Sequence, residues 1–496
     1  MAFSNTPSGD TYRTVQVKLD NTPTLRSISN SVRRDSHVIN FFYERISQEN
    51  KEREVSLVKR PGIQATSISL NKGVSTDNIR GYFYEEQEGI FFWAVGNMVY
   101  KYIPSPLGSY SSTVATLSTS SGEVCFDTFQ KSTGEVYILI SDGAGMVYQK
   151  LRTYPEPAAT AITTVPSPHQ PRFTVLNGYV FVAQGYDIHN CANDDFNTWN
   201  STDFISCEMS ADGIQGLYRN KNYIVALGYN SMETFWDAAN TNSPLSRNDS
   251  AFKSIGFNSG YAQVGDISFF VGQEQNKGLV VYKMDGFKVE PVSNAVVEKS
   301  ISSPHDTDYS SARVNYAKGH ILTIAGHTFY MLCGNDITWV YDIEEKFWYE
   351  WRSPTGTMLV EAAWAMFNGG QYIALNNGTT IDFISPLVYN DKGTNFTASY
   401  TSEDNMFGSV NWKTCNRLSV VSDRHQATGT STLTVQWSDN DWTDNPTGST
   451  TVNVFSNIGR NHRLGRFRNR SFRLLYTDNY PIRIKSLELE INIGSH

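Results

Sequence analysis

The chain has 496 residues, too many for one ordinary hydrophobic core, so its length predicts roughly two to four domains or one large repetitive architecture. Aromatic residues make up 13% of it and charged residues only 18%, a composition that favours half-buried strands over solvated helices and predicts an all-β fold. The formal net charge of −8 opposes general binding of nucleic acid by neutralisation of phosphates.

The chain begins with MAFSNTPSGDTYRTVQVKLD, which has no basic head followed by an apolar run. No later stretch approaches the ~18 uninterrupted apolar residues of a membrane helix, so we expect neither a classical export signal nor a membrane segment. The cysteines are odd in number, widely scattered and without a CxxC pair, which predicts free thiols made in a reducing cell. They are Cys125, Cys191, Cys207, Cys333 and Cys415.

The first 63 residues contain the clearest departure from a strand pattern. Residues 31–59 combine a high charge density with no sustained apolar spacing, which indicates an exposed arm or a short helix rather than a core element. We therefore expect residues 1–63 to form an extended N-terminal arm that leads into the region that follows.

Residues 64–390 repeat one unit, in which an alternating apolar run meets a Gly or Asn turn, then a second run, and often a Tyr-rich third run. Examples are IRGYFYEEQEGIFFWAVGNMVYKYI from Ile79 and YAQVGDISFFVGQEQNKGLVVYKMDGFKV from Tyr261. Successive units start roughly 40 to 55 residues apart, the spacing of four-stranded propeller blades. The pattern predicts a β-propeller of six or seven blades, because the first and last units could combine by exchanging a strand. A pair of β-sandwiches is the alternative.

After about residue 390 the strands lose the blade spacing, so we expect residues 391–496 to form a separate, sandwich-like C-terminal β domain. Within the stretch GRNHRLGRFRNRSFRLLY, strand alternation places three arginines on one side and Phe467 on the other. Alternation in LELEI places two glutamates on one side of a neighbouring strand. These candidate residues are Arg466, Arg468, Arg470, Glu488 and Glu490. The two charged rows could pair within one subunit or between two.

Enzyme chemistry finds little support in the chain. It contains no HExxH, GxSxG or P-loop motif, and no GxGxxG in a βαβ context. The turn SDNDWTD at 438–444 resembles the Asp box of sialidases, but it occurs once and outside the expected blades. Glycoside cleavage needs two carboxylates that face one sugar, and the carboxylates of the turn at 342–350 are expected to be solvated. We therefore expect no catalysis, no metal and no cofactor.

Three segments in chain order resemble the DNA-stabilising tail hub, or nozzle, proteins of short-tailed bacteriophages (podoviruses), a family of tail accessory factors. The first is VINFFYERISQENKEREVSLVKRPGI, whose matching residues are Asn40, Phe42, Tyr43, Glu44, Pro61, Gly62 and Ile63. The second is IQGLYRNKNYIVALGYNSMETFWDA, whose matching residues are Gly228, Ser231, Glu233 and Phe235. The third joins VQWSDNDWTDN to the Arg-rich stretch, with Trp437, Ser438, Asp439, Trp442, Gly465, Arg466, Arg468, Arg470 and Pro481.

The resemblance implies a structural protein of the virion, made in the bacterial cytoplasm. It implies a homohexamer that forms a tube below the head-to-tail adaptor protein, retains packaged DNA and conducts it during ejection. The further partners that it implies are a distal tail needle or tip, tail fibres or spikes, and double-stranded DNA that passes through the lumen without sequence-specific binding. Six copies at −8 sum to about −48, a net charge that keeps duplex DNA from adhering to the wall.

Within such an acidic oligomer, the arginine row is best placed at a subunit or partner interface, because the planar guanidinium binds carboxylates bidentately. Contact with DNA and a structural ladder within one chain are the alternatives for the row. For the whole chain, the competing function is a lectin-like propeller that binds carbohydrate or protein, and a sialidase-like glycosidase is less favoured. The oligomeric state separates the first two functions, because a hub forms or joins a six-fold ring.

Overall fold

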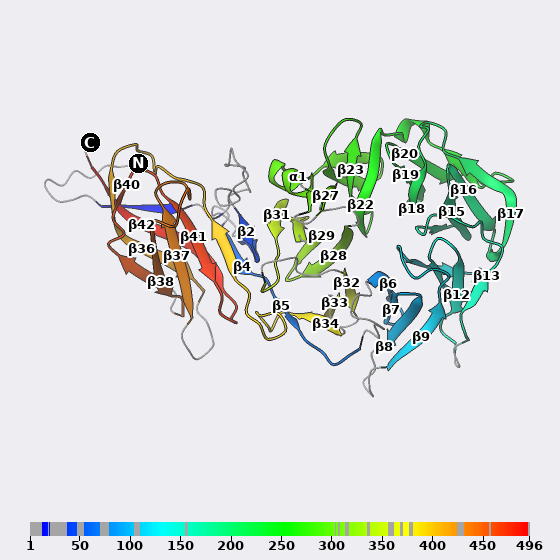
Figure 1. The fold of residues 1–496 in the computed structure, drawn as a ribbon, viewed down its shortest axis with the longest axis horizontal. Coiled ribbons are helices and arrows are strands. Elements are labelled where there is room, and N and C mark those ends of the chain that lie inside the picture. The colour runs from blue at the N-terminus through cyan, green and yellow to red at the C-terminus, as the bar shows by residue number, and fades with distance from the viewer. Residues whose placement is uncertain are drawn as a thin grey trace.

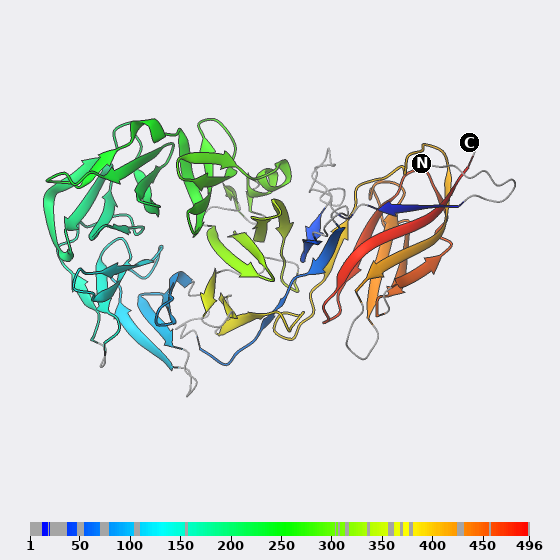
Figure 2. The same ribbon diagram turned by 180° about the vertical axis from the view of Figure 1, so that it is seen from behind.

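The computed structural model is built almost wholly from β-strands. It describes residues 12–17, 19, 37–46, 54–69, 79–103, 110–153, 157–302, 304–305, 308–312, 317–334, 338–355, 362–367, 371–375, 380–423, 431–455 and 458–494. In these ranges the helices are α1 (Ala295–Ser302) and the 3-10 turn η2 (Asp249–Ala251). Figures 1 and 2 show a ring of sheets beside a second, smaller body of strands.

Five sheets of the ring are each made of four consecutive antiparallel strands, as expected of propeller blades. In chain order the strands are β6 (Ile79–Glu85), β7 (Ile90–Val95), β8 (Met98–Ile103), β9 (Tyr110–Thr116), β10 (Cys125–Gln130), β11 (Val136–Ser141), β12 (Met146–Lys150), β13 (Thr160–Ile162), β14 (Thr174–Leu176), β15 (Tyr179–Gln184), β16 (Asp187–Ala192), β17 (Asp195–Ser206), β18 (Ile214–Asn220), β19 (Tyr223–Gly228), β20 (Met232–Asp237), β21 (Leu245–Arg247), β22 (Ile255–Val264), β23 (Ile267–Glu274), β24 (Val280–Asp285) and β25 (Lys288–Pro291).

The rest of the ring is composite. Strands β28 (Lys318–Ile324), β29 (His327–Cys333), β30 (Thr338–Asp342) and β31 (Phe347–Glu350) belong to a larger sheet that leaves the propeller. Strands β32 (Ala362–Phe367), β33 (Gln371–Leu375) and β34 (Ile381–Ser385) take their fourth strand, β5 (Gly62–Gln64), from the N-terminal part of the chain. Contacts of β6 with β10 and β32, and of β28 with β22 and β32, close the ring.

The all-β propeller predicted from the repeat is therefore confirmed. Among the described residues, the structure shows five self-contained blades rather than the six or seven expected. The difference arises because the last two units of the repeat are not self-contained sheets. The sheet of one unit continues into the second body, and the sheet of the other is completed by β5.

The second body consists of two packed sheets. One contains β3 (Phe41–Ile46), β4 (Glu54–Lys59), β42 (Arg483–Ile493), β36 (Lys413–Ser422) and β39 (Ile458–His462), with β1 (Arg13–Val17) on β42 and β40 (Arg466–Phe467) on β36. The other contains β2 (Val38–Ile39), β35 (Ala398–Thr401), β41 (Ser471–Tyr476), β37 (Thr432–Ser438) and β38 (Gly448–Asn453). A separate hairpin is formed by β26 (Pro304–His305) and β27 (Asp308–Ala312). Alternate apolar side chains of β42 enter the core between the two sheets.

The described N-terminal strands belong to this second body rather than to an extended arm. β3 and β4 form a hairpin, and both β1 and β4 pair with β42. The charged segment 31–59 therefore contains buried strands, because Phe41, Tyr43 and Leu57 are all 0% exposed. Residues 1–11, 18, 20–36 and 47–53 of the expected arm lie outside the described residues.

Candidate functional site

A continuous sheet joins the propeller to the second body. Strand β2 pairs in parallel with β31 through Ile39 and Glu350, and in antiparallel with β35 on its other side. The propeller sheet β28–β31 thus runs without a break into the sheet β35–β41–β37–β38. Because backbone hydrogen bonds cross from one body to the other, their relative orientation is fixed by more than side-chain contact.

Asn40 is the central residue of this junction. It is 1% exposed and has a φ of 54°, a left-handed conformation that Asn tolerates better than most residues. Its Nδ2 donates to the carbonyl of Thr397 at 2.9 Å, and its Oδ1 accepts from Arg60 Nε at 2.9 Å and from the backbone N of Arg352 at 2.8 Å. One amide side chain therefore links the N-terminal strands, the propeller and the second body.

Arg60 and Asp391 form a buried bidentate pair next to Asn40. Arg60 Nη2 lies 2.6 Å from Asp391 Oδ2, and Nη1 lies 3.1 Å from Oδ1. Nη2 also donates to the carbonyl of Arg352 at 3.0 Å, and the guanidinium carbon lies 3.7 Å from the ring centre of Phe396. Sequence reasoning missed this pair. No local signal marks it, because Lys and Arg beside a Pro-Gly turn are ordinarily solvated.

Lys59 brings a second cation into the same core. Its Nζ donates to the carbonyls of Tyr389 at 2.9 Å and Asp478 at 2.7 Å, and lies 4.4 Å from the ring centre of Phe396. Burial, and secondarily the charge of Arg60, lower the pKa of Lys59 to about 7. The junction thus contains an ammonium group whose charge depends on pH near neutrality.

Tyr43 and Glu44 attach the hairpin β3–β4 to both bodies. The backbone N of Tyr43 donates to the hydroxyl of Tyr349 at 3.1 Å, and the two rings meet edge to face with centres 5.6 Å apart. The carboxylate of Glu44 forms an ion pair with Arg483 of β42. Tyr43 and Glu44, two of the residues that carry the family resemblance, therefore make structural contacts within one chain.

Pro61 and Gly62 carry the chain from the junction into the propeller. The carbonyl of Pro61 accepts from Arg60 Nη1 at 2.9 Å, and the backbone N of Gly62 donates to the carbonyl of Val388 at 2.6 Å. A Cβ atom at residue 62 would lie 2.0 Å from the carbonyl oxygen of Asn390. Only glycine fits this close approach, which explains why the Pro-Gly pair precedes β5.

The turn Trp437-Ser438-Asp439 holds one arginine of the C-terminal stretch. Ser438 Oγ accepts from the backbone N of Trp442 at 2.8 Å and donates to Asn440 Oδ1 at 2.8 Å, which shapes the turn. The carboxylate of Asp439 then accepts from Arg470 Nε at 2.6 Å and from Nη2 at 2.9 Å. The ring of Trp437 lies 5.5 Å from the guanidinium carbon of Arg470.

The three arginines do not form one row. Arg470 is 1% exposed and its Nη1 donates to the carbonyl of Leu464, so it is a core residue and not a subunit contact. Arg466 and Arg468 are exposed, and their guanidinium carbons lie 5.4 and 5.1 Å from the ring centre of Trp412. The expected alternation is wrong because β40 ends at Phe467 and the chain bends over the next two residues.

The two glutamates have partners other than these arginines. Glu490 Oε2 lies 2.8 Å from Arg417 Nη2, and its Oε1 accepts from Asn416 Nδ2 at 3.0 Å. Glu488 Oε1 accepts from Ser486 Oγ at 3.2 Å. The glutamate row therefore lies on β42 without pairing to the Arg-rich stretch in the part of the chain that the structure describes.

The central-blade motif also has a structural role. Asp212 accepts from the backbone N of Asn230 at 2.5 Å and from Ser231 Oγ at 2.7 Å, and a Cβ atom at Gly228 would lie 2.6 Å from the same carboxylate. Glu233 is 2% exposed, and burial raises its pKa. Its Oε1 accepts from the backbone N of Met209 at 3.0 Å, while Phe235 is 0% exposed.

Side chains link the first strands of different blades. The hydroxyl of Tyr82, from β6, lies 2.7 Å from His320 Nδ1, from β28 on the other side of β32. Farther round the ring, Tyr218 and Tyr261 stack with ring centres 3.6 Å apart, and Arg172 Nη1 donates to the hydroxyl of Tyr218 at 2.5 Å. Burial lowers the pKa of His320 to about 3, so its imidazole is neutral at physiological pH.

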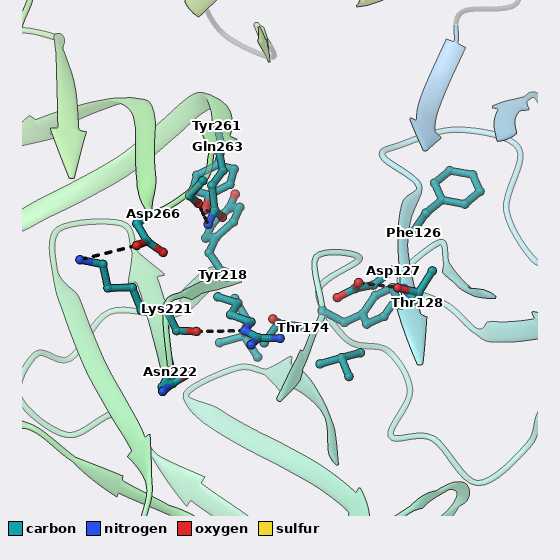
Figure 3. Close-up of a pocket in the computed structure, with 15 residues that line it drawn as sticks. Phe126, Asp127, Thr128, Thr174, Tyr218, Lys221, Asn222, Tyr261, Gln263 and Asp266 are labelled. Carbon is teal, nitrogen blue, oxygen red and sulfur yellow. Dashed lines mark hydrogen bonds and ion pairs between the residues drawn. The ribbon is translucent and has the colours of Figure 1, made fainter. Parts of the chain in front are cut away.

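Beside this packing lies a cavity of about 770 Å³, lined from β10, β14, β18 and β22. Figure 3 shows Asp127 and Thr128 on one side and Tyr218, Tyr261 and Lys221 on the other. Burial raises the pKa of Asp127 to about 6. The lining offers hydrogen-bonding groups and aromatic faces. Among the described residues, no cluster of His, Cys, Asp and Glu is suited to a metal.

No helix in the described ranges is long and apolar enough to cross a membrane. All five cysteines are free thiols. Burial raises the pKa of Cys191 to about 12 and that of Cys415 to about 11. These thiols therefore stay protonated at neutral pH and act as small core residues.

Comparison with known proteins identifies the family. No curated protein matches the chain significantly. Among solved structures, the chain is similar to the Pan2 WD40 domain of Neurospora crassa, with 12% identity, a TM-score of 0.40, and coverage of 66% of this chain and 95% of that one. The family model described as "Bacteriophage P22 Gp10, beta-propeller" matches residues 46–378, which is more than half of the chain. The chain therefore belongs to this phage stabilisation family of tail-associated β-propeller proteins.

Proposed function

We propose that this phage tail protein is the hub, or nozzle, of a short-tailed virion. In this proposal six copies form a ring below the head-to-tail adaptor, retain the packaged DNA and conduct it during ejection. The family match across the propeller carries the proposal. The protein is made in the bacterial cytoplasm and acts in the assembled particle, without catalysis or a cofactor.

The small size of the propeller interior supports a path for DNA between copies rather than through one copy. The cavity between the blades of one copy has a volume of only about 770 Å³, whereas the major groove of B-DNA alone is about 12 Å wide. A lumen must therefore be enclosed by several copies. Six copies would carry about −48 formal charges, so the wall would repel phosphates and DNA would slide with few ion pairs.

The junction supports a role in resisting mechanical force. The sheet that passes through β2 and the buried contacts of Asn40, Arg60 and Asp391 hold the propeller and the second body as one unit. A hub that resists the pressure of packaged DNA needs such a connection. The adaptor on one side, and a distal needle or tip with fibres or spikes on the other, are the neighbours in this proposal.

Electron microscopy of particles of the encoding phage, labelled with gold-conjugated antibody against this protein, tests the function. We expect label only at the short tail of DNA-filled capsids. Label that is absent from all particles while the protein accumulates outside them would contradict the proposal. Antibody against the major capsid protein provides the positive control for the same particles.

The cavity favours a second candidate function, lectin-like binding. Its lining combines aromatic faces with the hydroxyl and amide groups of Thr128, Asn222 and Gln263, a chemistry that suits a saccharide. Binding to a glycan array that is lost in Asn222→Ala and retained in a variant outside the cavity, such as Lys277→Ala, would favour this candidate. Absence of binding to every glycan would remove it.

A further inference from the structure

The tip of the second body carries an exposed surface, here called the basic patch, made of Met406, Val410, Trp412, Arg466 and Arg468. Met406 is 54% exposed, Val410 72% and Trp412 39%. Figure 1 places β40, which contains Arg466, at the end of this body remote from the propeller. Exposed apolar side chains of this size, grouped with arginines, are typical of protein interfaces.

The basic patch is held in shape before any partner arrives. Both guanidinium groups lie over the Trp412 ring, and no carboxylate of the described residues pairs with either. The backbone N of Gly494 donates to the carbonyl of Trp412 at 2.8 Å, and the rings of Phe407 and Phe467, which are next to patch residues in the sequence, meet edge to face. Arginines that are already stacked lose little conformational entropy on binding. The two guanidinium groups can therefore pair with carboxylates of a partner at low entropic cost.

A second exposed surface, here called the acidic patch, is made of Tyr186, Glu208, Met209 and Tyr229 on the propeller. These side chains are respectively 52%, 71%, 43% and 57% exposed. They lie on one face because the connection 207–213 runs between the turns of two neighbouring blades. The backbone N of Cys207 donates to the carbonyl of Tyr186 at 2.9 Å.

The charge of this face is negative. Arg247 is surrounded by three carboxylates: Asp249 Oδ1 lies 2.8 Å from its Nε, while Glu208 Oε2 and Glu233 Oε2 each lie 3.7 Å from its Nη1. One cation cannot neutralise three anions. Of the two carboxylates at 3.7 Å, Glu208 is 71% exposed and Glu233 only 2%. Glu208 is thus available to a cation from outside the chain.

We propose that the basic patch of one copy binds the acidic patch of the next copy, head to tail. A self-complementary contact between two basic patches is disfavoured because it would place Arg466 and Arg468 against the same arginines. The two patches lie toward opposite ends of the long axis, as β40 and the strands β19 and β20 show in Figure 1. One copy can therefore engage two neighbours at once, and a head-to-tail contact closes into a ring when its rotation permits. The inference rests on the proposed hub for the assembly being a ring.

A charge swap in the full-length protein tests this contact. Sedimentation velocity and light scattering would follow assembly of the wild type, Arg468→Glu, Glu208→Arg and the double variant. We expect each single variant to weaken self-association by about tenfold or more, and the double variant to recover most of it because the attraction is restored with reversed sign. Arg460→Glu, an exposed charge reversal on β39 outside the patch, is the matched control. Thermal unfolding of each variant checks that the fold is retained.

The contact is overturned if the wild type stays monomeric, if folded single variants assemble like the wild type, or if the double variant stays as weak as the single variants. These outcomes are separate from the test of the proposed function. Gold label at the tail combined with insensitivity to the charge swap rejects this contact and keeps the hub. Assembly that follows the charge swap, in a protein that is missing from virions, keeps the contact and rejects the hub.

Discussion

Arg60 Nη2 lies 2.6 Å from Asp391 Oδ2, and the two side chains are only 1% and 6% exposed although 331 positions separate them in the chain. This pair fixes the strand that leaves the second body to the segment that returns to it from the propeller. Because both charges are desolvated, each depends on the other to remain buried.

Asp391→Ala should therefore lower the free energy of unfolding by about 3–5 kcal/mol, because it leaves the Arg60 guanidinium without its anion. The double variant Arg60→Met with Asp391→Leu should lose much less, since it removes both charges. Urea unfolding followed by tryptophan fluorescence measures both. The exposed pair of Lys277 and Glu274 gives the control, because Glu274→Ala should leave the midpoint unchanged. An unchanged midpoint in Asp391→Ala would show that the pair does not stabilise the junction.

Lys59 gives the junction a defined pH dependence. Its pKa is about 7 in the folded chain and near 10.5 when unfolded, so above pH 7 the unfolded state binds more protons and stability rises with pH. The rise is at most about 1.4 kcal/mol per pH unit. Lys59→Met should remove it. The comparison is the difference between wild type and variant in urea unfolding from pH 7 to 8.5, in which thiol ionisation cancels because it is common to both proteins. Parallel curves would contradict a depressed pKa.

The blades were predictable because their signal is local. Each self-contained blade takes four consecutive strands, so alternation and turns recur within about 50 residues. The composite parts depend on pairs that are remote in sequence, such as Ile39 with Glu350 and Ile63 with Ile384. Nothing in the segment around Asn40 states that its partner lies 357 positions away at Thr397. An N-terminal arm was expected because residues 31–59 have a high charge density, and their distant partners could not be known from the sequence.

The arginine stretch shows a second limit. Alternation is reliable inside a strand, but β40 is only two residues long, so residues 468 and 470 no longer follow its phase. Arg470 became a core residue because Asp439 lies in a turn brought close by β37. The motif residues around 437–439 were found from the sequence, whereas their role in holding Arg470 required the structure.

Gly62→Ala tests the strand that completes the propeller. The added Cβ would lie 2.0 Å from the Asn390 carbonyl oxygen and 2.7 Å from its backbone N, so the backbone must shift and β5 must move from β34. We expect a loss of about 1–3 kcal/mol or more, with a lower midpoint in differential scanning calorimetry. Gly213→Ala is the control, because its nearest atom is 3.7 Å away and its φ is not positive. Equal midpoints for the two variants would contradict the close approach.

Arg470 and Arg468 should separate stability from assembly, although they lie two positions apart. Arg470→Ala removes the partner of Asp439 and the donor to Leu464, so it should cost about 2–4 kcal/mol in urea unfolding. Arg468→Ala removes an exposed group that touches only the Trp412 ring in the described part of the chain, so the unfolding midpoint should stay unchanged.

Asp439→Asn provides the matched test of the buried partner, because it keeps the size of the side chain and removes its charge. It should lie between wild type and Arg470→Ala, since the amide can accept only one of the two hydrogen bonds that Arg470 now donates. A destabilised Arg468→Ala together with a stable Arg470→Ala would reverse the assignment. In that case the exposed Arg468 would stabilise the second body, and the buried Arg470 would contribute nothing to stability that alanine cannot replace.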